Sequence, residues 1–143
     1  MAVIYLGLGS NIGNRTEQLN RAIELLKKSG IDIRKVSSYI ETDPVGGPPQ
    51  GRFLNAVAMA ETKTSPAELL KTVQSIESAM GRVRTTANSP RPIDIDILLY
   101  DTLTLQSQDL TIPHPRMHQR AFVLNPLREI APQRMKEFLD AHH

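Results

Sequence analysis

The chain has 143 residues, of which 40% are hydrophobic and 22% are charged, and its formal net charge at pH 7 is +2. These values exclude a disordered chain and favour a single soluble globular domain over residues 1–143. The small basic excess gives no argument for nucleic acid or a membrane as a partner. Without cysteine, the chain has no disulfide, thiolate zinc site or cysteine nucleophile. We expect a cytoplasmic protein, and a monomer because no second apolar surface stands out.

The first predicted elements are a buried strand over residues 3–9 and a helix over residues 14–29. The apolar run at the start is too short for a signal peptide or a membrane span. The segment GLGSNIG, which begins at the end of the predicted strand and runs to the start of the helix, resembles a dinucleotide-binding loop. The G-x-G-x-x-G pattern, however, requires glycine where this sequence has Ile12. We therefore interpret this segment as a tight strand-to-helix turn.

A second strand is predicted over residues 31–42, where Ile31 and Ile33 alternate with polar residues. Residues 44–51 contain three glycines and three prolines, which indicates a loop. A third strand is expected over residues 53–62.

The next helix has the clearest start in the sequence, because Ser65, Pro66 and Glu68 form a capping box with proline in the first helical position. We expect it to end near Gly81. A basic loop over residues 82–92 and a fourth strand over residues 93–100 follow. Prolines then limit the C-terminal helices to short ones.

The predicted order of elements is β-α-β-β-α-β. This order indicates an α+β, ferredoxin-like fold: an antiparallel sheet with helices packed on it, followed here by short C-terminal helices.

The fourth predicted strand, in RPIDIDILLYD, alternates isoleucine with Asp94 and Asp96, so both carboxylates share one face. At about 6.5–7 Å along the strand, the two charges repel each other. Arg82, Arg84 and Arg91 precede them with no acidic residue between. Mg²⁺ bound to a polyphosphate would compensate the repulsion, and the arginines would bind the phosphate oxygens. The alternative is a solvent-facing pair on an edge strand.

Two further pairs of residues have open interpretations. Phe53 and Asn55 share a face of the third predicted strand, which fits either core packing or a stacking and hydrogen-bonding site for a flat heterocycle. His114 and His118 have an H-x₃-H spacing, but prolines flank the first histidine and no H-E-x-x-H motif is present. We favour phosphate binding by His114, beside Arg120, over a zinc site.

Five segments occur in order: GLGSNIGNR, FLNAVAMAET, QSIESAMGRVR, RPIDIDILLYD and IPHPRMHQRAFVLNPLREIAP. Through them the chain resembles the 6-hydroxymethyl-7,8-dihydropterin pyrophosphokinase family of folate biosynthesis, from the first strand to about Pro132. The P-R-x-x-D-x-D-I segment is the most distinctive. The resemblance implies transfer of the β,γ-diphosphate of ATP to the hydroxymethyl oxygen of 6-hydroxymethyl-7,8-dihydropterin, with release of AMP.

The resemblance also implies roles for residues at matching positions. Asp94 and Asp96 would bind two Mg²⁺ ions, and they would form the catalytic set together with Arg82 and Arg91. The ATP-binding residues would be Gln74, Glu77, Arg84, Ile97, Thr111, His114 and Arg120. The pterin-binding residues would be Thr42, Asp43, Val45, Phe53, Asn55 and Phe122, with the pterin stacked between the two phenyl rings.

The sequence departs from the family pattern at two places. Asn88 and Ser89 stand where relatives often carry Trp and Gly, in a loop that closes over the site in the family. Pro115 stands where some relatives carry Tyr, which removes a nucleotide contact.

One rival interpretation is an RNA-recognition domain, which has the same order of elements. Such a domain needs several aromatic residues on its third strand, and this strand offers only Phe53. A purely structural ferredoxin-like domain would leave the paired aspartates and the arginines unexplained.

Overall fold

The computed structural model describes residues 1–44, 50–82 and 91–141, and its main sheet has the strand order β2-β4-β1-β5, with β3 also paired to β4. All pairings in this sheet are antiparallel. The predicted ferredoxin-like fold is confirmed. The strands are β1 (Ala2–Ser10), β2 (Asp32–Val36), β3 (Ile40–Thr42), β4 (Phe53–Thr62), β5 (Asp94–Tyr100), β6 (Leu105–Gln106) and β7 (Thr111–Ile112). The helices are α1 (Arg15–Lys28), α2 (Pro66–Ala79), the 3₁₀ turn η1 (Met117–Gln119), α3 (Ala121–Ile130) and α4 (Pro132–Ala141).

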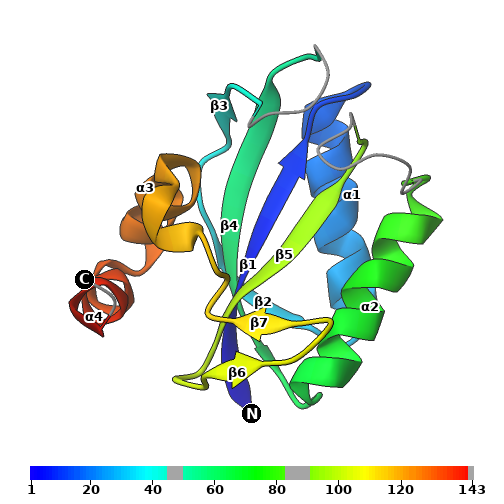
Figure 1. Cartoon of the computed structure of the whole chain (residues 1–143). Helices are drawn as coiled ribbons and strands as arrows, with labels where there is room; N and C mark the ends of the chain where they lie inside the picture. The colour runs from blue at the N-terminus through cyan, green and yellow to red at the C-terminus, as the bar shows by residue number, and fades with distance from the viewer. Residues whose placement is uncertain (45–49, 83–90, 142–143) are drawn as a thin grey trace.

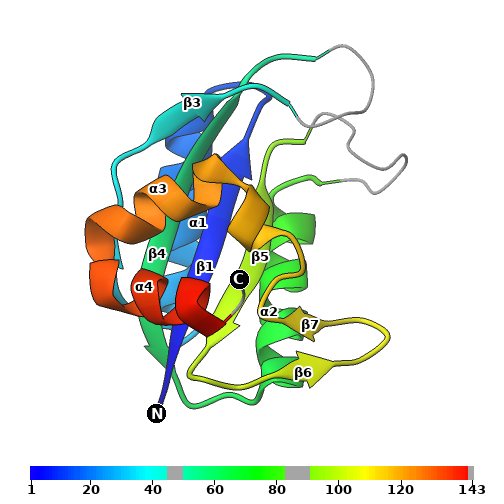
Figure 2. The same cartoon turned by 60° about the vertical axis from the view of Figure 1, so that its left-hand side comes forward.

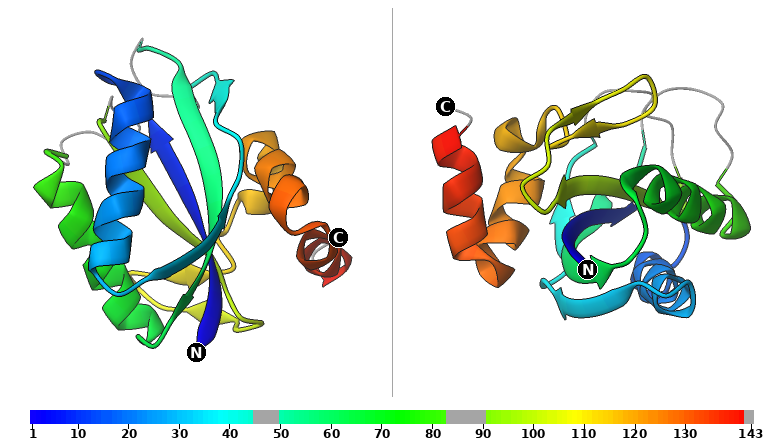
Figure 3. Two further views of the ribbon diagram at one scale, coloured as in Figure 1. Left: turned by 180° about the vertical axis from the view of Figure 1, so that it is seen from behind. Right: turned by 90° about the horizontal axis from the view of Figure 1, so that it is seen from below.

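The molecule has three layers, with α1 and α2 on one face of the sheet and α3 and α4 on the other (Figures 1 and 3). Strand alternation divides β1 between two cores, because Ile4 and Leu6 pack toward α1 and α2 while Tyr5 packs toward α3 and α4. The central strand is therefore buried on both faces, which explains its continuous apolar sequence.

Helices α3 and α4 cover only part of their face of the sheet (Figure 2). Their buried side chains pack around Tyr5, Val57 and Leu99. On the rest of this face, β1 presents Gly7 and Gly9, and none of the helices in the described residues covers them. The functional cavity described below lies on that part of the sheet.

The prediction of one strand over residues 31–42 is wrong, because the segment is divided into β2 and β3. The break is at Ser37, whose amide donates to the Val57 carbonyl at 2.9 Å while its hydroxyl accepts from the Val57 amide at 2.9 Å. A side-chain oxygen thus replaces a backbone carbonyl, and the strand bends there.

The strand predicted over residues 3–9 is confirmed by β1, so only the second half of the GLGSNIG segment forms the predicted turn. Gly7 and Gly9 lie within β1, where their partners on β5 are Asp96 and Asp94. Of the three glycines in this segment, Gly13 alone has a positive φ, of 69°, and it belongs to the turn before α1.

The remaining elements agree with the sequence, with one addition. The capping box of Ser65 and Glu68 is present at the start of α2. Helices α3 and α4 have 10 residues each, so the C-terminal helices are short, as predicted. The β6–β7 hairpin was not predicted, because strands of two residues leave no periodic pattern. In the part of the chain that the structure describes, no helix is long and apolar enough to cross a membrane.

Candidate active site

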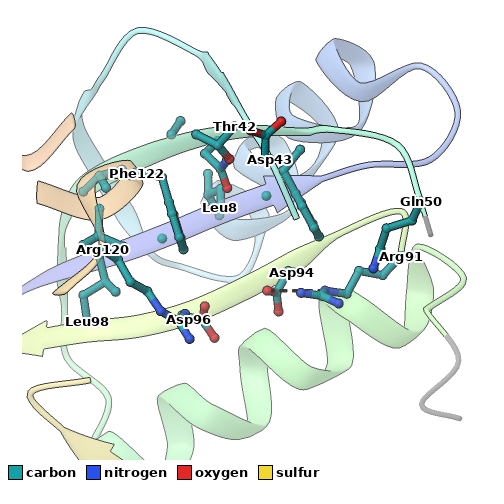
Figure 4. A pocket seen from close by; sticks show the side chains of 17 residues that line it. Leu8, Thr42, Asp43, Gln50, Arg91, Asp94, Asp96, Leu98, Arg120 and Phe122 are labelled. Atoms are coloured by element: carbon teal, nitrogen blue, oxygen red, sulfur yellow. Dashed lines mark hydrogen bonds and ion pairs between the residues drawn. The ribbon is translucent and has the colours of Figure 1, made fainter. Parts of the chain in front are cut away.

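The uncovered part of the sheet is the floor of an open cavity of about 670 Å³ (Figure 4). We call it the aromatic cavity, after Phe53 and Phe122. Its floor needs glycine, since a Cβ on Gly9 would lie 2.9 Å from Oδ1 of Asn55 and would displace that amide. The lining residues are Gly7, Leu8, Gly9, Thr42, Asp43, Gln50, Phe53, Asn55, Ala56, Val57, Arg91, Asp94, Asp96, Leu98, Arg120, Phe122 and Val123.

An arginine lies beside each phenyl ring of the aromatic cavity. The guanidinium carbon of Arg91 is 4.8 Å from the centroid of Phe53, and that of Arg120 is 5.5 Å from the centroid of Phe122. Both distances are within the range of cation–π contacts. The Asn55 side chain donates to the hydroxyl of Thr42, which ties β4 to β3 at the cavity wall. Phe53 lines the cavity and contacts Arg91, although only 8% of its surface is exposed.

A second cavity, of about 830 Å³, lies between α2 and the β6–β7 hairpin, and we call it the hairpin cavity. Asp94 and Asp96 line both cavities and so lie on the boundary between them. Their side chains extend from β5 into the site, with Arg91 on one side and Arg120 on the other (Figure 4). The hairpin cavity is lined by Leu70, Val73, Gln74, Glu77, Arg82, Asp94, Ile95, Asp96, Ile97, Gln108, Asp109, Leu110, Thr111, His114 and Pro115.

Arg82, just after α2, is held between two carboxylates. Its Nη1 lies 2.7 Å from Oε2 of Glu77 and 2.6 Å from Oδ1 of Asp94. Burial by itself would lower the pKa of Arg82, but Asp94 and Glu77 raise it above the ordinary value, so the guanidinium is charged. The same oxygen of Glu77 accepts from the Ile95 amide at 2.9 Å. Glu77 thus supports Arg82 at the wall of the hairpin cavity, with its side chain only 4% exposed.

The surroundings of Asp96 disfavour the ionised form of its carboxyl group. Burial, together with the neighbouring Asp94 and Glu77 carboxylates, raises the pKa of Asp96 to about 7. Its side chain nevertheless keeps 39% of its surface accessible, because it faces the cavities. The Nε2 atom of His114 is 4.0 Å from its Oδ1. Burial and the nearby Arg120 lower the pKa of His114, so this ring is neutral near pH 7 and does not compensate the carboxylate.

We expect Asp96→Asn to gain stability relative to the original protein as the pH rises from about 4 to 7. The unfolded carboxyl ionises near 3.8 and the folded one near 7, so ionisation opposes folding over this interval. Thermal unfolding in EDTA at several pH values measures the effect. Because 39% of the side chain is exposed to solvent, we expect a contribution of only about 1 kcal/mol, which corresponds to a midpoint difference that grows by about 2–4 °C. A difference that does not change with pH would contradict the assignment of the raised pKa to Asp96.

The structure brings most of the predicted site residues together. Those predicted for the pterin line the aromatic cavity, and Asp43, whose side chain is 86% exposed, is at its rim. Those predicted for ATP line the hairpin cavity, except that Arg120 lines the aromatic cavity. Val45, Arg84 and the departure at Asn88 and Ser89 lie outside the described residues. The departing Pro115 does line the hairpin cavity.

Sequence reasoning missed the roles of the two β1 glycines. Their positions opposite Asp96 and Asp94 follow from strand register, which the sequence does not reveal. The only available signal was their i, i+2 spacing, which places both on one face of a strand.

Two adjoining cavities, separated by paired carboxylates and bordered by arginines, are typical of an enzyme that acts on phosphorylated substrates. They are not typical of an RNA-recognition domain, whose sheet presents several stacking rings. The model of the 7,8-dihydro-6-hydroxymethylpterin-pyrophosphokinase family matches residues 5–132. The chain belongs to this family and is therefore a pyrophosphokinase, which confirms the resemblance seen in the sequence.

Individual relatives agree with this assignment. The chain is 44% identical over 140 residues to the 2-amino-4-hydroxy-6-hydroxymethyldihydropteridine pyrophosphokinase of Bacillus subtilis, which covers 97% of the chain and 84% of that relative. It is 42% identical over 127 residues to a mitochondrial folate synthesis bifunctional protein of Pisum sativum, covering 89% of the chain and 25% of that protein. The relatives that are named for pyrophosphokinase alone are thus matched over most of their length.

A solved structure of similar fold is the HPPK-DHPS of Plasmodium falciparum, with a TM-score of 0.74 and 16% sequence identity. The match covers 92% of this chain and 41% of that one. At this identity the similarity supports the fold alone.

Proposed function

We propose that this protein transfers the β,γ-diphosphate of ATP to the hydroxymethyl oxygen of 6-hydroxymethyl-7,8-dihydropterin and releases AMP, with Mg²⁺ bound at Asp94 and Asp96. The observation that carries the proposal is that both aspartates line two different cavities. A group held in one cavity would meet a group held in the other directly over these carboxylates. This is the arrangement that transfer between two substrates requires.

The aromatic cavity suits the pterin. A flat heterocycle can stack on Phe53 and Phe122, and the side chain of Asn55 offers hydrogen bonds at its edge. Thr42 and Asp43 add polar groups on the same wall. The hairpin cavity, with Gln74, Thr111 and His114 on its walls, then remains for the nucleotide.

The donor set fits Mg²⁺, which takes oxygen ligands and uses one or two carboxylates together with phosphates and waters. Among residues 1–44, 50–82 and 91–141, no group of three or more His, Cys, Asp and Glu side chains could hold a metal ion, so the two aspartates would rely on substrate oxygens. The unfavourable negative charge at Asp96 would be relieved by a cation there. When bound, Mg²⁺ would neutralise phosphate charge and lower the pKa of the attacking hydroxyl.

The side chains themselves orient and neutralise the substrates. Arg82 and Arg91 both contact Asp94, at 2.6 Å and 3.5 Å, so their guanidinium groups lie where a transferred phosphate would accumulate charge. No side chain has to act as a nucleophile, because the substrate hydroxyl attacks in line. Arg120 lines the aromatic cavity and would bind phosphate oxygens from the opposite side.

Three further inferences belong to the same proposal. We include two Mg²⁺ ions in the proposal, because Asp94 and Asp96 could each hold one ion. A monomer and a cytoplasmic location stay predictions from the sequence.

The proposal is tested by incubating the protein with ATP, Mg²⁺ and 6-hydroxymethyl-7,8-dihydropterin and separating the nucleotides. We expect AMP to appear in a one-to-one ratio with the diphosphorylated pterin. Omitting the pterin, or adding EDTA, is expected to abolish AMP formation. Formation of ADP in place of AMP would show transfer of a single phosphoryl group and would refute the proposed reaction.

A further inference from the structure

Asn11 lies in the turn between β1 and α1 and is only 8% exposed, although its side chain is polar. It lines neither cavity. Buried polar side chains are normally fixed by hydrogen bonds, so their partners show what they hold in place.

The bonds of Asn11 join three separate parts of the chain. Its side-chain Oδ1 accepts from the backbone amide of Arg91 at 2.9 Å. Its backbone amide donates to the Arg91 carbonyl at 3.2 Å. Its Nδ2 donates to Oε1 of Gln50 at 2.6 Å and to the Gly51 carbonyl at 3.2 Å. Asn11 thus forms hydrogen bonds with both the backbone N–H and the backbone carbonyl of Arg91.

The residues held in this way form one end of the aromatic cavity. Gln50 and Arg91 both line it, and Arg91 lies against Phe53 and 3.5 Å from Asp94. A shift of the Arg91 backbone would move its guanidinium relative to both the ring and the carboxylate. Displacements of about 1 Å in a catalytic group can lower rates by about a hundredfold.

We propose that Asn11 is a positioning residue, which fixes the backbone of Arg91 so that its guanidinium lies over Phe53 and beside Asp94. This inference rests on the proposed function, because it assigns a purpose to the placement of Arg91.

The test is a double-mutant cycle with Asn11→Ala and Arg91→Ala, measured as kcat and as KM for both substrates. We expect Asn11→Ala to lower kcat about tenfold in the original protein and less than about twofold in the Arg91→Ala background. Losses that multiply in the double variant would overturn the proposal, since Asn11 would then act independently of Arg91.

Two further variants separate positioning from stability. Asn11→Asp keeps the acceptor for the Arg91 amide but loses the donor to the Gly51 carbonyl, so we expect a lower unfolding temperature together with a kcat within about threefold of the original value. If Asn11→Asp is as slow as Asn11→Ala, the bond to Arg91 is not the cause. Asn14→Ala is the matched control, since Asn14 in the same turn caps α1 by accepting from the Glu17 amide. We expect it to lower the unfolding temperature and to leave kcat unchanged.

A failure of the proposed function can be told apart from a failure of this inference. Absence of AMP formation by the original protein refutes the function, whatever Asn11 does. The position of Arg91 can still be followed without turnover, by the chemical shift of its amide in ¹⁵N NMR spectra. We expect this signal to move in Asn11→Ala much more than in Asn14→Ala, and equal shifts would refute the positioning role.

Discussion

Asp96→Ala is expected to lower kcat by about three orders of magnitude while the protein stays folded. The carboxylate lies on the boundary between the two cavities, where the proposed Mg²⁺ would neutralise the transferred diphosphate. Loss of about 4 kcal/mol of transition-state stabilisation corresponds to that factor. Stability is expected to hold, because the substitution removes one of three neighbouring carboxylates. The measurements are AMP formation at saturating Mg²⁺ and substrates, and a thermal unfolding curve.

The matched control for Asp96→Ala is Asp140→Ala, which removes an exposed carboxylate from α4. We expect this control to keep its full turnover. If Asp96→Ala also keeps its turnover at saturating Mg²⁺, the metal-binding role of the carboxylate is wrong, even though the family assignment would stand.

Asn55→Ala is expected to weaken pterin binding by about 10- to 100-fold and to leave ATP affinity nearly unchanged. The amide lines the aromatic cavity and is absent from the walls of the hairpin cavity. Loss of one or two hydrogen bonds at about 1.5 kcal/mol each accounts for the change. Calorimetric titration with each ligand separately measures both affinities.

Asn20→Ala provides the comparison for Asn55→Ala, because Asn20 on α1 also loses a side-chain hydrogen bond, the one it accepts from Tyr39 at 2.6 Å. It lines neither cavity, so both affinities are expected to stay at their original values. Equal losses of pterin and ATP affinity in Asn55→Ala would mean that the two cavities are assigned to the wrong substrates.

The sequence by itself determined the fold class, the family and the elements with strong local signals. The capping box at Ser65 defined the start of α2, because it depends only on residues three positions apart. Alternation in β5 placed Asp94 and Asp96 on the face opposite Ile95 and Ile97, as the structure confirms. Both signals are local, so no tertiary contact was needed to read them.

Local sequence patterns gave the wrong prediction where a residue far away in the sequence determines the local structure. The division of the second predicted strand depends on Ser37, whose hydroxyl bonds to an amide of β4. The family resemblance assigned Glu77 to ATP binding, yet the approach of Arg82 and β5 makes it the buried support of an arginine. Neither contact can be predicted from the spacing of nearby residues in the sequence.

The site itself was decided only by tertiary structure. Registers of β1 and β5 bring Gly7 and Gly9 opposite the aspartates, and the limited extent of α3 and α4 leaves that part of the sheet open. Asn11 gains its partners only when the turn after β1 meets Gly51 and Arg91. Residue types and their spacing thus specify which chemistry the chain can support, since they are properties of single strands and helices. Distances between segments far apart in sequence are fixed only by folding. They determine the two cavities and place the carboxylates of Asp94 and Asp96 between them.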